Sequence, residues 1–110
     1  MSKKLQWSKE APERMTWKEA QEYAKNLREG GYDDWRLPTL AELTIALANQ
    51  FIKDGPKEPL GFCFGLNYWS SLDNDINSAW CTYADSSGFI DSSTECKDYC
   101  YAVRLVKEVK

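Results

Sequence analysis

The chain has 110 residues, of which 43% are hydrophobic and 28% are charged, and it contains no histidine. This length and composition predict one globular domain over residues 1–110. The missing histidine excludes Ser-His-Asp and Cys-His nucleophile pairs, imidazole acid–base catalysis and histidine-ligated metals. The net charge is −3 and no basic run is present, so we expect no nucleic-acid partner.

The compartment is not decided by the sequence. No apolar run approaches the roughly 18 residues of a membrane-spanning helix, so we expect no membrane insertion. The start of the chain, Met1 to Lys4, leads into Leu5 and Trp7 without the apolar stretch of a signal peptide. An extracellular or cell-surface location stays open if a leader was removed, and the cytoplasm is the alternative.

The first elements in chain order are a short strand over residues 5–7 and a helix that begins near Trp17. Thr16 and Glu19 form a capping box at the start of that helix. Apolar side chains then follow at helical spacing. Gly30-Gly31 is expected to end the helix, with one of the two glycines in the left-handed conformation.

A second helix is predicted after Pro38, where Thr39 and Glu42 repeat the capping box. Its apolar residues fall on two faces, which predicts a helix that is buried on two sides. One face carries Leu40, Leu43, Leu47 and Phe51, and the other carries Ala41, Ile45 and Ile52.

The second half of the chain is predicted to form strands. Asp54-Gly55-Pro56 and Glu58-Pro59 indicate a loop, after which short aromatic and β-branched runs alternate with turn residues. We expect strands over residues 68–71, 79–84, 89–90 and 99–109, and the first and last strands could pair. The element order predicts an α+β fold with two helices packed on a small twisted antiparallel sheet and a long loop region.

Four blocks of the sequence together resemble a known family. They are Met15-Thr16-Trp17-Lys18-Glu19-Ala20, Gly31-Tyr32-Asp33-Asp34-Trp35-Arg36-Leu37-Pro38-Thr39 with Glu42-Leu43, Tyr68-Trp69-Ser70-Ser71, and Ala102-Val103-Arg104-Leu105-Val106. The chain resembles the family named for the C-terminal domain of the collagen-like adhesin Lcl, a former domain-of-unknown-function family. The resemblance covers about Leu5 to Lys107 and implies a C-type-lectin-like fold.

The residues of these blocks can also be explained by their roles in the fold, and we expect most of their side chains to be structural. Asp33 or Asp34 is expected to accept from backbone amides or to pair with Arg36, and Arg104 is expected to pair with an acid. The residues assigned to the scaffold are Trp17, Trp35, Arg36, Pro38, Trp69 and Arg104, with Trp80 as a further core anchor.

The cysteines Cys63, Cys81, Cys96 and Cys100 predict one or two local disulfides in an oxidising compartment, and free thiols in a reducing one. Their spacing disfavours zinc, because the paired Cys-x2-Cys pattern is missing. The family resemblance implies a further bridge from the first helix to the last strand. We assign Ala24 and Leu105 to those places, which predicts packing instead of that bridge.

No metal or cofactor is expected, although calcium deserves a check in a lectin-like fold. Asp73-Asn74-Asp75-Ile76-Asn77 resembles the start of an EF-hand loop, but Ser78 and Ala84 replace the required glycine and glutamate. Glu58-Pro59-Leu60 and Trp69-Ser70-Ser71 depart from the sugar-binding motifs that the resemblance would imply. These departures favour a polar turn, with calcium binding as the weaker alternative.

Function is predicted from the acidic segment between Gly61 and Asp98, which combines aromatic and asparagine side chains. We expect a non-catalytic binding or adhesion module that presents a loop face, about residues 61–98, to a glycan or a protein. The adhesin's sulfated polysaccharide is not carried over, because that ligand needs basic residues. The candidate ligand-binding residues are Tyr68, Asp73, Asn74, Asp75, Asn77, Tyr83 and Asp85.

Two alternatives stay open. The first is a structural domain of a larger surface protein or of a phage-type receptor-binding protein. The second is a thiol oxidase similar to the formylglycine-generating enzymes, in which Cys96 and Cys100 would form the thiol pair. The second alternative is disfavoured because those enzymes are much longer.

Overall fold

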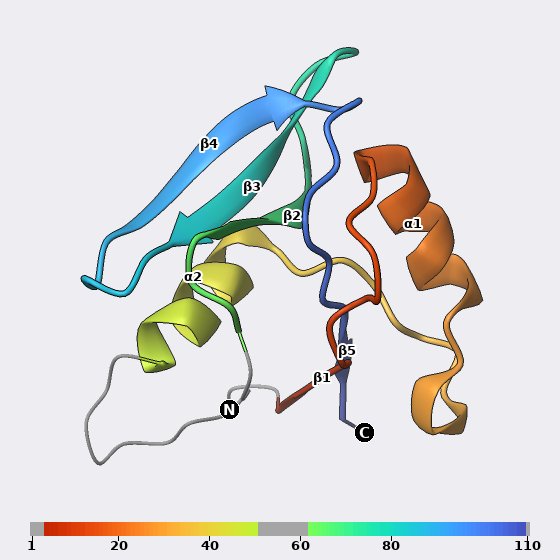
Figure 1. Cartoon of the computed structure of the whole chain (residues 1–110). Coiled ribbons are helices and arrows are strands. Elements are labelled where there is room, and N and C mark those ends of the chain that lie inside the picture. The colour runs from red at the N-terminus through yellow and green to blue at the C-terminus, as the bar shows by residue number, and fades with distance from the viewer. Residues whose placement is uncertain (1–3, 51–61, 110) are drawn as a thin grey trace.

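The computed structural model describes residues 4–50 and 62–109. The elements are β1 (Leu5–Trp7), α1 (Trp17–Asn26), a 3-10 turn (Glu29–Gly31), α2 (Leu40–Asn49), β2 (Leu66–Asp73), β3 (Ser78–Ala84), β4 (Ile90–Cys96) and β5 (Val106–Glu108). They form a three-stranded antiparallel sheet in the order β2-β3-β4 and a two-stranded sheet of β1 and β5 (Figure 1). This confirms the α+β class, whereas the lectin-like topology stays a prediction.

Both capping boxes are present where the sequence predicts them. The Thr16 hydroxyl accepts from the Glu19 amide at 3.2 Å, and the Glu19 carboxylate accepts from the Thr16 amide at 2.9 Å. Thr39 and Glu42 repeat this exchange at 3.1 and 2.8 Å. Each box satisfies backbone donors that would otherwise lack a partner at the start of a helix.

The first helix ends earlier than the glycine pair indicates. α1 stops at Asn26, because Leu27 turns to an extended conformation and packs against the core. Gly30 and Gly31 instead shape the 3-10 turn that follows, with φ of 67° and 83°. Both glycines are therefore left-handed, where one was expected.

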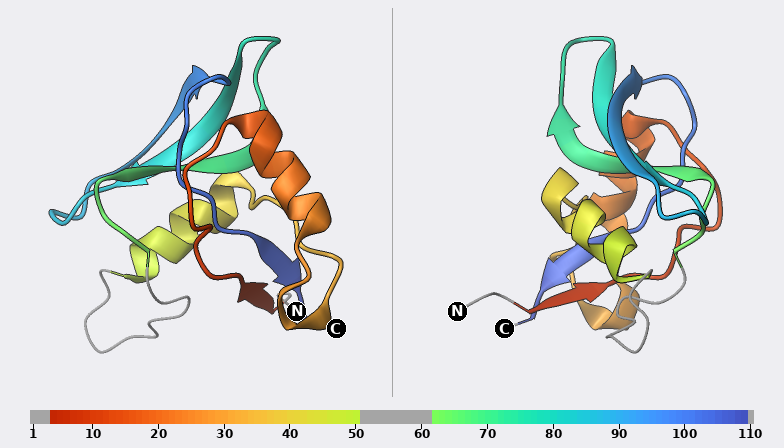
Figure 2. Two further views of the ribbon diagram at one scale, coloured as in Figure 1. Left: turned by 45° about the vertical axis from the view of Figure 1, so that its right-hand side comes forward. Right: turned by 90° about the vertical axis from the view of Figure 1, so that its left-hand side faces the viewer.

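The prediction that the second helix is buried on two sides is wrong for the described residues. Leu43, Ala46 and Leu47 are buried, but Ile45 is 62% exposed and Ala41 also faces solvent. The reason is that α2 contacts the β2-β3-β4 sheet on one side only (Figure 2). Phe51, Ile52 and the loop predicted over 54–59 lie outside the described residues.

The central strand of the larger sheet is β3, which pairs with β4 along its whole length. β2 pairs with β3 in register from Leu66 to Trp69, and an irregularity follows before Asp73. β4 is longer than the sequence indicates, because its polar run after Ile90 lacks the apolar alternation that reveals a strand. Only its pairing with β3 identifies this segment as a strand.

The two ends of the chain pair as expected. Leu5 lies opposite Glu108 and Trp7 opposite Val106 in the antiparallel β1-β5 pair. The long final strand predicted from Tyr99 is shorter, since only residues 106–108 form β5 and the preceding segment makes isolated bridges. No helix in the described parts of the chain is long and apolar enough to cross a membrane.

Three buried tryptophans pack with smaller apolar residues in the core between α1, β2 and the C-terminal segment. Trp17, Trp35 and Trp69 are 8%, 5% and 0% exposed and belong to one cluster with Leu105. Trp80 is only half-buried, so it anchors the core less than the sequence suggests. A second cluster around Leu43, Leu47, Phe62 and Tyr68 joins α2 to the opposite side of the sheet.

Candidate functional site

The predicted ligand-binding residues do not meet on one loop face. Asp73, Asn74, Asp75 and Asn77 lie at the turn between β2 and β3, whereas Asp85 lies at the turn between β3 and β4 (Figure 1). The seven-residue strand β3 separates the two turns by about 20 Å. The structure therefore divides the predicted site into two.

The carboxylates of the first turn are occupied by structural hydrogen bonds. One oxygen of Asp75 accepts from the amides of Asn77 and Ser78 and from the Ser78 hydroxyl, each at 2.8 Å. The Ser78 hydroxyl is the main cause that lowers the pKa of Asp75, followed by the Asn77 amide. Asp73 pairs with Lys97 at 2.7 Å. These contacts fit the polar turn rather than the calcium loop.

Asp85 has the same role in the second turn. It accepts from the amide and the hydroxyl of Ser87, at 2.9 and 2.5 Å, and the Ser87 hydroxyl is the main cause that lowers its pKa. No group of three or more His, Cys, Asp or Glu side chains within residues 4–50 and 62–109 is placed to hold a metal ion.

Tyr68, a candidate ligand-binding residue, is not placed to contact a ligand, because its side chain is 0% exposed. Its hydroxyl donates to the Glu10 carboxylate and accepts from the Cys63 amide at 2.9 Å. Its ring packs edge-on against Phe62, with 5.0 Å between the ring centroids. Burial, followed by the hydrogen bond to Glu10, raises the pKa of Tyr68. Tyr83 is half-buried on β3.

All four cysteines are free thiols, so the disulfide prediction is not confirmed. Cys63 and Cys100 are exposed, Cys96 is half-buried and Cys81 is buried. Burial raises the pKa of Cys81 to about 11, and its thiol donates to the Asn67 side-chain oxygen at 3.5 Å. Cys81 therefore stays protonated near neutral pH and behaves as a core residue.

A groove lies beside α1, along the segment that joins the 3-10 turn to α2. Arg36 fixes this segment against β5, since its amide and carbonyl exchange two 2.9 Å hydrogen bonds with Val106. The Pro38 carbonyl accepts from the Ser71 amide at 2.8 Å, which ties the other end to β2. The Trp35 indole donates to the Glu29 carbonyl at 3.1 Å and keeps its ring in the core.

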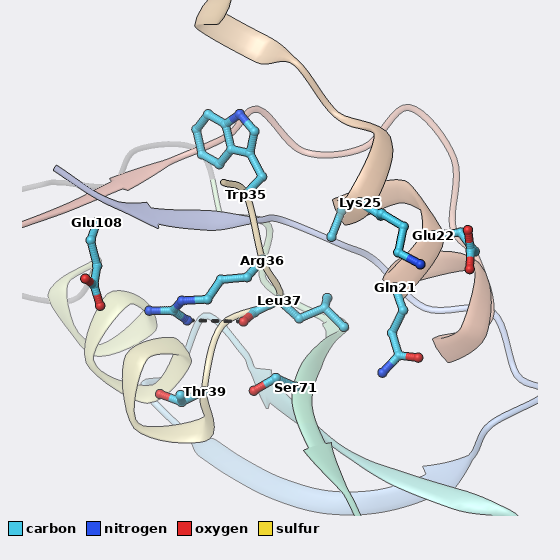
Figure 3. A pocket seen from close by; sticks show the side chains of 10 residues that line it. Gln21, Glu22, Lys25, Trp35, Arg36, Leu37, Thr39, Ser71 and Glu108 are labelled. Carbon is cyan, nitrogen blue, oxygen red and sulfur yellow. Dashed lines mark hydrogen bonds between the residues drawn. The ribbon is translucent and has the colours of Figure 1, made fainter. Parts of the chain in front are cut away.

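The groove is open and has a volume of about 760 Å³ (Figure 3). Apolar side chains contribute to its lining, and polar side chains come from α1, the joining segment, β2 and β5. Gln21 comes from α1 and Ser71 from β2, and the two lie on different sides of the groove in Figure 3. The lining residues are Gln21, Glu22, Ala24, Lys25, Trp35, Arg36, Leu37, Thr39, Ser71 and Glu108.

Of the two alternatives for Asp33 and Asp34, the pairing with Arg36 is not the one that forms. The Arg36 guanidinium instead makes two parallel hydrogen bonds of 2.8 Å to Glu42. This carboxylate is already oriented by the capping box, so it is preorganised for the guanidinium. Asp34 lies 3.8 Å from the ammonium of Lys107. The hydrogen bond to Glu42 is the main cause that raises the pKa of Arg36, and Arg36 in turn lowers the pKa of Glu42.

Replacing Glu42 with glutamine is expected to lower the free energy of unfolding by about 1–2 kcal/mol, after allowing for solvent screening of a partly exposed pair. The variant weakens both the capping box and the ion pair with Arg36. Glu19→Gln is the matched control, because Glu19 closes the same capping box but makes no described ion pair. Urea unfolding should therefore show a smaller loss for Glu19→Gln, and equal losses would contradict a role for the ion pair.

The pH dependence of this difference has a defined sign. The pKa of Glu42 is lower in the folded protein than in the unfolded chain, where it is about 4.3. Its ionised form therefore stabilises the fold fully above that unfolded value, and the contribution is lost as the pH falls through the lower folded value. The stability gap between the wild type and Glu42→Gln should narrow over that acidic range.

Several polar side chains of the groove are not used by the fold. Within the described residues, the side chains of Gln21, Glu22, Lys25 and Ser71 make no hydrogen bond or ion pair. The sequence did not indicate them as ligand-binding residues, because Gln21, Glu22 and Lys25 lie on a solvated helix face and the block that contains Ser71 is expected to be structural. The sequence predicts structural roles for Trp35, Arg36 and Pro38 in the joining segment, and only the folded chain places this segment beside these free groups.

Comparison with models of protein families gives a match. The family model described as the Lcl C-terminal domain matches residues 1–107. This range includes all four sequence blocks and every residue that lines the groove except Glu108. A comparison with curated proteins finds no match.

Proposed function

Because the chain belongs to the family of Lcl C-terminal domains, we propose that it is a non-catalytic binding module whose ligand occupies the groove beside α1. The observation that carries the proposal is the groove itself. Its volume of about 760 Å³ falls within the range of roughly 300–1,000 Å³ that is usual for ligand sites. Within the described residues, the side chains of Gln21, Glu22, Lys25 and Ser71 in this groove can bind a ligand without breaking a hydrogen bond or ion pair of the fold.

The two hairpin turns support the proposal less well. Their carboxylates are committed to backbone and hydroxyl groups, and a ligand would have to compete with these bonds. The groove offers uncommitted donors and acceptors beside apolar groups, an arrangement that is typical of binding sites. The proposed ligand surface therefore moves from the expected loop face to the groove.

A binding role without catalysis is also consistent with the chemistry of the lining residues. A serine nucleophile needs a base within hydrogen-bond reach, but the Ser71 side chain has no hydrogen-bond partner within the described residues. No cysteine lines the groove, so a thiol-oxidase reaction would need a different place. These features support a site that holds a ligand and does not transform it.

Replacing Gln21 and Lys25 together with alanine is expected to weaken binding by tenfold or more, since each lost polar contact costs about 1 kcal/mol or more. The measurement is binding of the full chain to ligands found on a glycan and protein array. Lys18→Ala is the matched control, because Lys18 is an exposed cation of α1 that does not line the groove.

A hairpin variant separates the groove from the originally expected loop face. Asn74→Ala with Asp75→Asn should leave binding unchanged if the groove holds the ligand. Loss of binding in this variant, with full binding in the Gln21 and Lys25 variant, would contradict the proposal. If the groove variant changes no interaction of the domain, the alternative of a structural domain in a larger surface or phage-type receptor-binding protein is favoured.

A further inference from the structure

The three-stranded sheet has two outer edges, and they differ in how they are covered (Figure 1). At the β2 edge, the Trp69 amide donates to the Ala102 carbonyl at 3.1 Å. The Ser71 amide on the same edge donates to the Pro38 carbonyl at 2.8 Å. No strand within residues 4–50 and 62–109 pairs with the outer edge of β4. In this part of the chain, β4 therefore presents an open edge.

The hydrogen bonds beyond the two ends of the β3-β4 pair show which backbone groups of β4 point outward. The Asp85 amide donates to the Phe89 carbonyl at 3.0 Å, and the Lys97 amide donates to the Asn77 carbonyl at 2.8 Å. Because bonded and non-bonded positions alternate in an antiparallel pair, the odd-numbered residues of β4 bond to β3. The amides and carbonyls that point to the open edge belong to Ile90, Ser92 and Thr94.

β4 lacks most of the features that protect an open strand edge from pairing with another chain. Such edges usually carry proline, lysine or a bulge. β4 contains neither proline nor lysine, and it pairs with β3 without a register shift over its whole length. Its charged residues are Asp91 and Glu95. These carboxylates disfavour pairing with an acidic strand but favour pairing with a basic one.

The two carboxylates are placed to meet an added strand. Asp91 and Glu95 are four positions apart, so they lie on the same face of β4. Asp91 is exposed, and Glu95 is half-buried and accepts from the Tyr101 hydroxyl at 2.8 Å through one oxygen. Opposite an added antiparallel strand, both residues occupy non-hydrogen-bonded positions, where facing side chains lie closest. The next basic residue along the chain, Lys97, is paired with Asp73 at 2.7 Å.

We propose that the open edge of β4 is a second binding surface, which takes an extended segment of another protein with two basic residues four positions apart. The basic side chains lie opposite Asp91 and Glu95, and the backbone of the segment bonds to the outward-facing groups of β4. A second copy of the chain fits less well, because the register centred on Ser93 places the two carboxylates opposite each other across the copies. No residue of β4 lines the groove beside α1, so the two surfaces are separate.

The experiment measures binding of the full chain to a synthetic peptide by calorimetry. The peptide carries two lysines four positions apart among threonines and valines, and a control peptide carries them three positions apart, on opposite faces of a strand. We expect the first peptide to bind about tenfold more tightly, with an affinity that falls as salt rises. It should also slow hydrogen exchange at the Ser92 and Thr94 amides but not at the Ser93 amide, which bonds to β3.

Two pairs of variants test the backbone and the charges independently. Thr94→Pro removes an outward amide without breaking a bond to β3, and should weaken peptide binding by about tenfold or more. Thr94→Ala is its control, since it loses the same side chain but keeps the amide. Asp91→Asn with Glu95→Gln should also weaken binding by about tenfold or more. Its control is Glu13→Gln with Asp33→Asn, which removes the same charges from exposed residues outside the sheet.

The outcomes distinguish this surface from the groove and from self-association. Absence of binding by the first peptide, or equal losses in a test variant and its control, would overturn the proposal. Self-association of the chain that Thr94→Pro abolishes would assign the edge to a second copy and overturn the basic partner. Peptide binding that is lost in the Gln21 and Lys25 variant would place the peptide in the groove and overturn the β4 edge alone.

Discussion

Replacing Trp69 with alanine is expected to lower the free energy of unfolding by about 3–5 kcal/mol or to unfold the domain outright. Trp69 is 0% exposed, and its ring packs edge-on against Tyr101 with 5.0 Å between the ring centroids. Its indole nitrogen donates to the Met15 carbonyl at 2.9 Å, so the variant also removes the partner of a backbone acceptor. Urea unfolding followed by far-UV circular dichroism measures the effect.

Trp80→Ala is the matched control for this prediction. Trp80 is the same residue type on the neighbouring strand β3, but it is only half-buried. Trp80→Ala should therefore lower the free energy of unfolding by clearly less than Trp69→Ala. The reason is that Trp80 buries less apolar surface and does not belong to the core cluster. Equal losses for the two variants would contradict the greater contribution of Trp69 to the core.

Replacing Arg104 with alanine is the second large effect, with an expected loss of about 3 kcal/mol. Its guanidinium is buried, with Nε donating to the Ser8 carbonyl at 2.9 Å and the positive charge 4.5 Å from the Phe62 ring centroid. Burial lowers the pKa of Arg104, an effect opposed by the neighbouring Tyr68 and Glu10. Arg104→Ala would leave a cavity, and the neighbouring Tyr68 and Glu10 would lose the nearby positive charge.

The measurement is again the free energy of unfolding, with two comparisons. Arg104→Lys keeps the charge but loses the planar guanidinium, so it should recover only part of the loss. Arg14→Ala removes an exposed arginine and should change stability by less than about 0.5 kcal/mol. If Arg104→Ala costs no more than Arg14→Ala, the guanidinium does not hold the N-terminal segment against the C-terminal one.

The features that the sequence predicted correctly are mostly local. A capping box spans four consecutive residues, so Thr16 with Glu19 and Thr39 with Glu42 can be recognised without knowing what packs around them. The strand over residues 79–84 was recognisable from its alternation. β4 was mostly missed, because its polar residues acquire their conformation by pairing with β3.

The candidate site could not be predicted from the sequence for a related reason. The lining residues of the groove come from α1, the joining segment, β2 and β5. No pattern within one of these segments shows that Gln21 and Ser71 lie beside the same groove. The acidic and aromatic segment after Gly61 looked more promising, but its turns use their carboxylates locally and its Tyr68 is buried.

The sequence by itself determined the α+β class, both capping boxes and the family, because these depend on local spacing and on specific blocks of residues. It allowed the pairing of the chain ends, which the folded chain then established. The tertiary structure decided which partner Arg36 takes, that Ile45 is exposed and that Tyr68 is buried. It also decided that a groove forms beside α1. These outcomes depend on which surfaces meet when distant segments pack, and side-chain identity alone does not specify that.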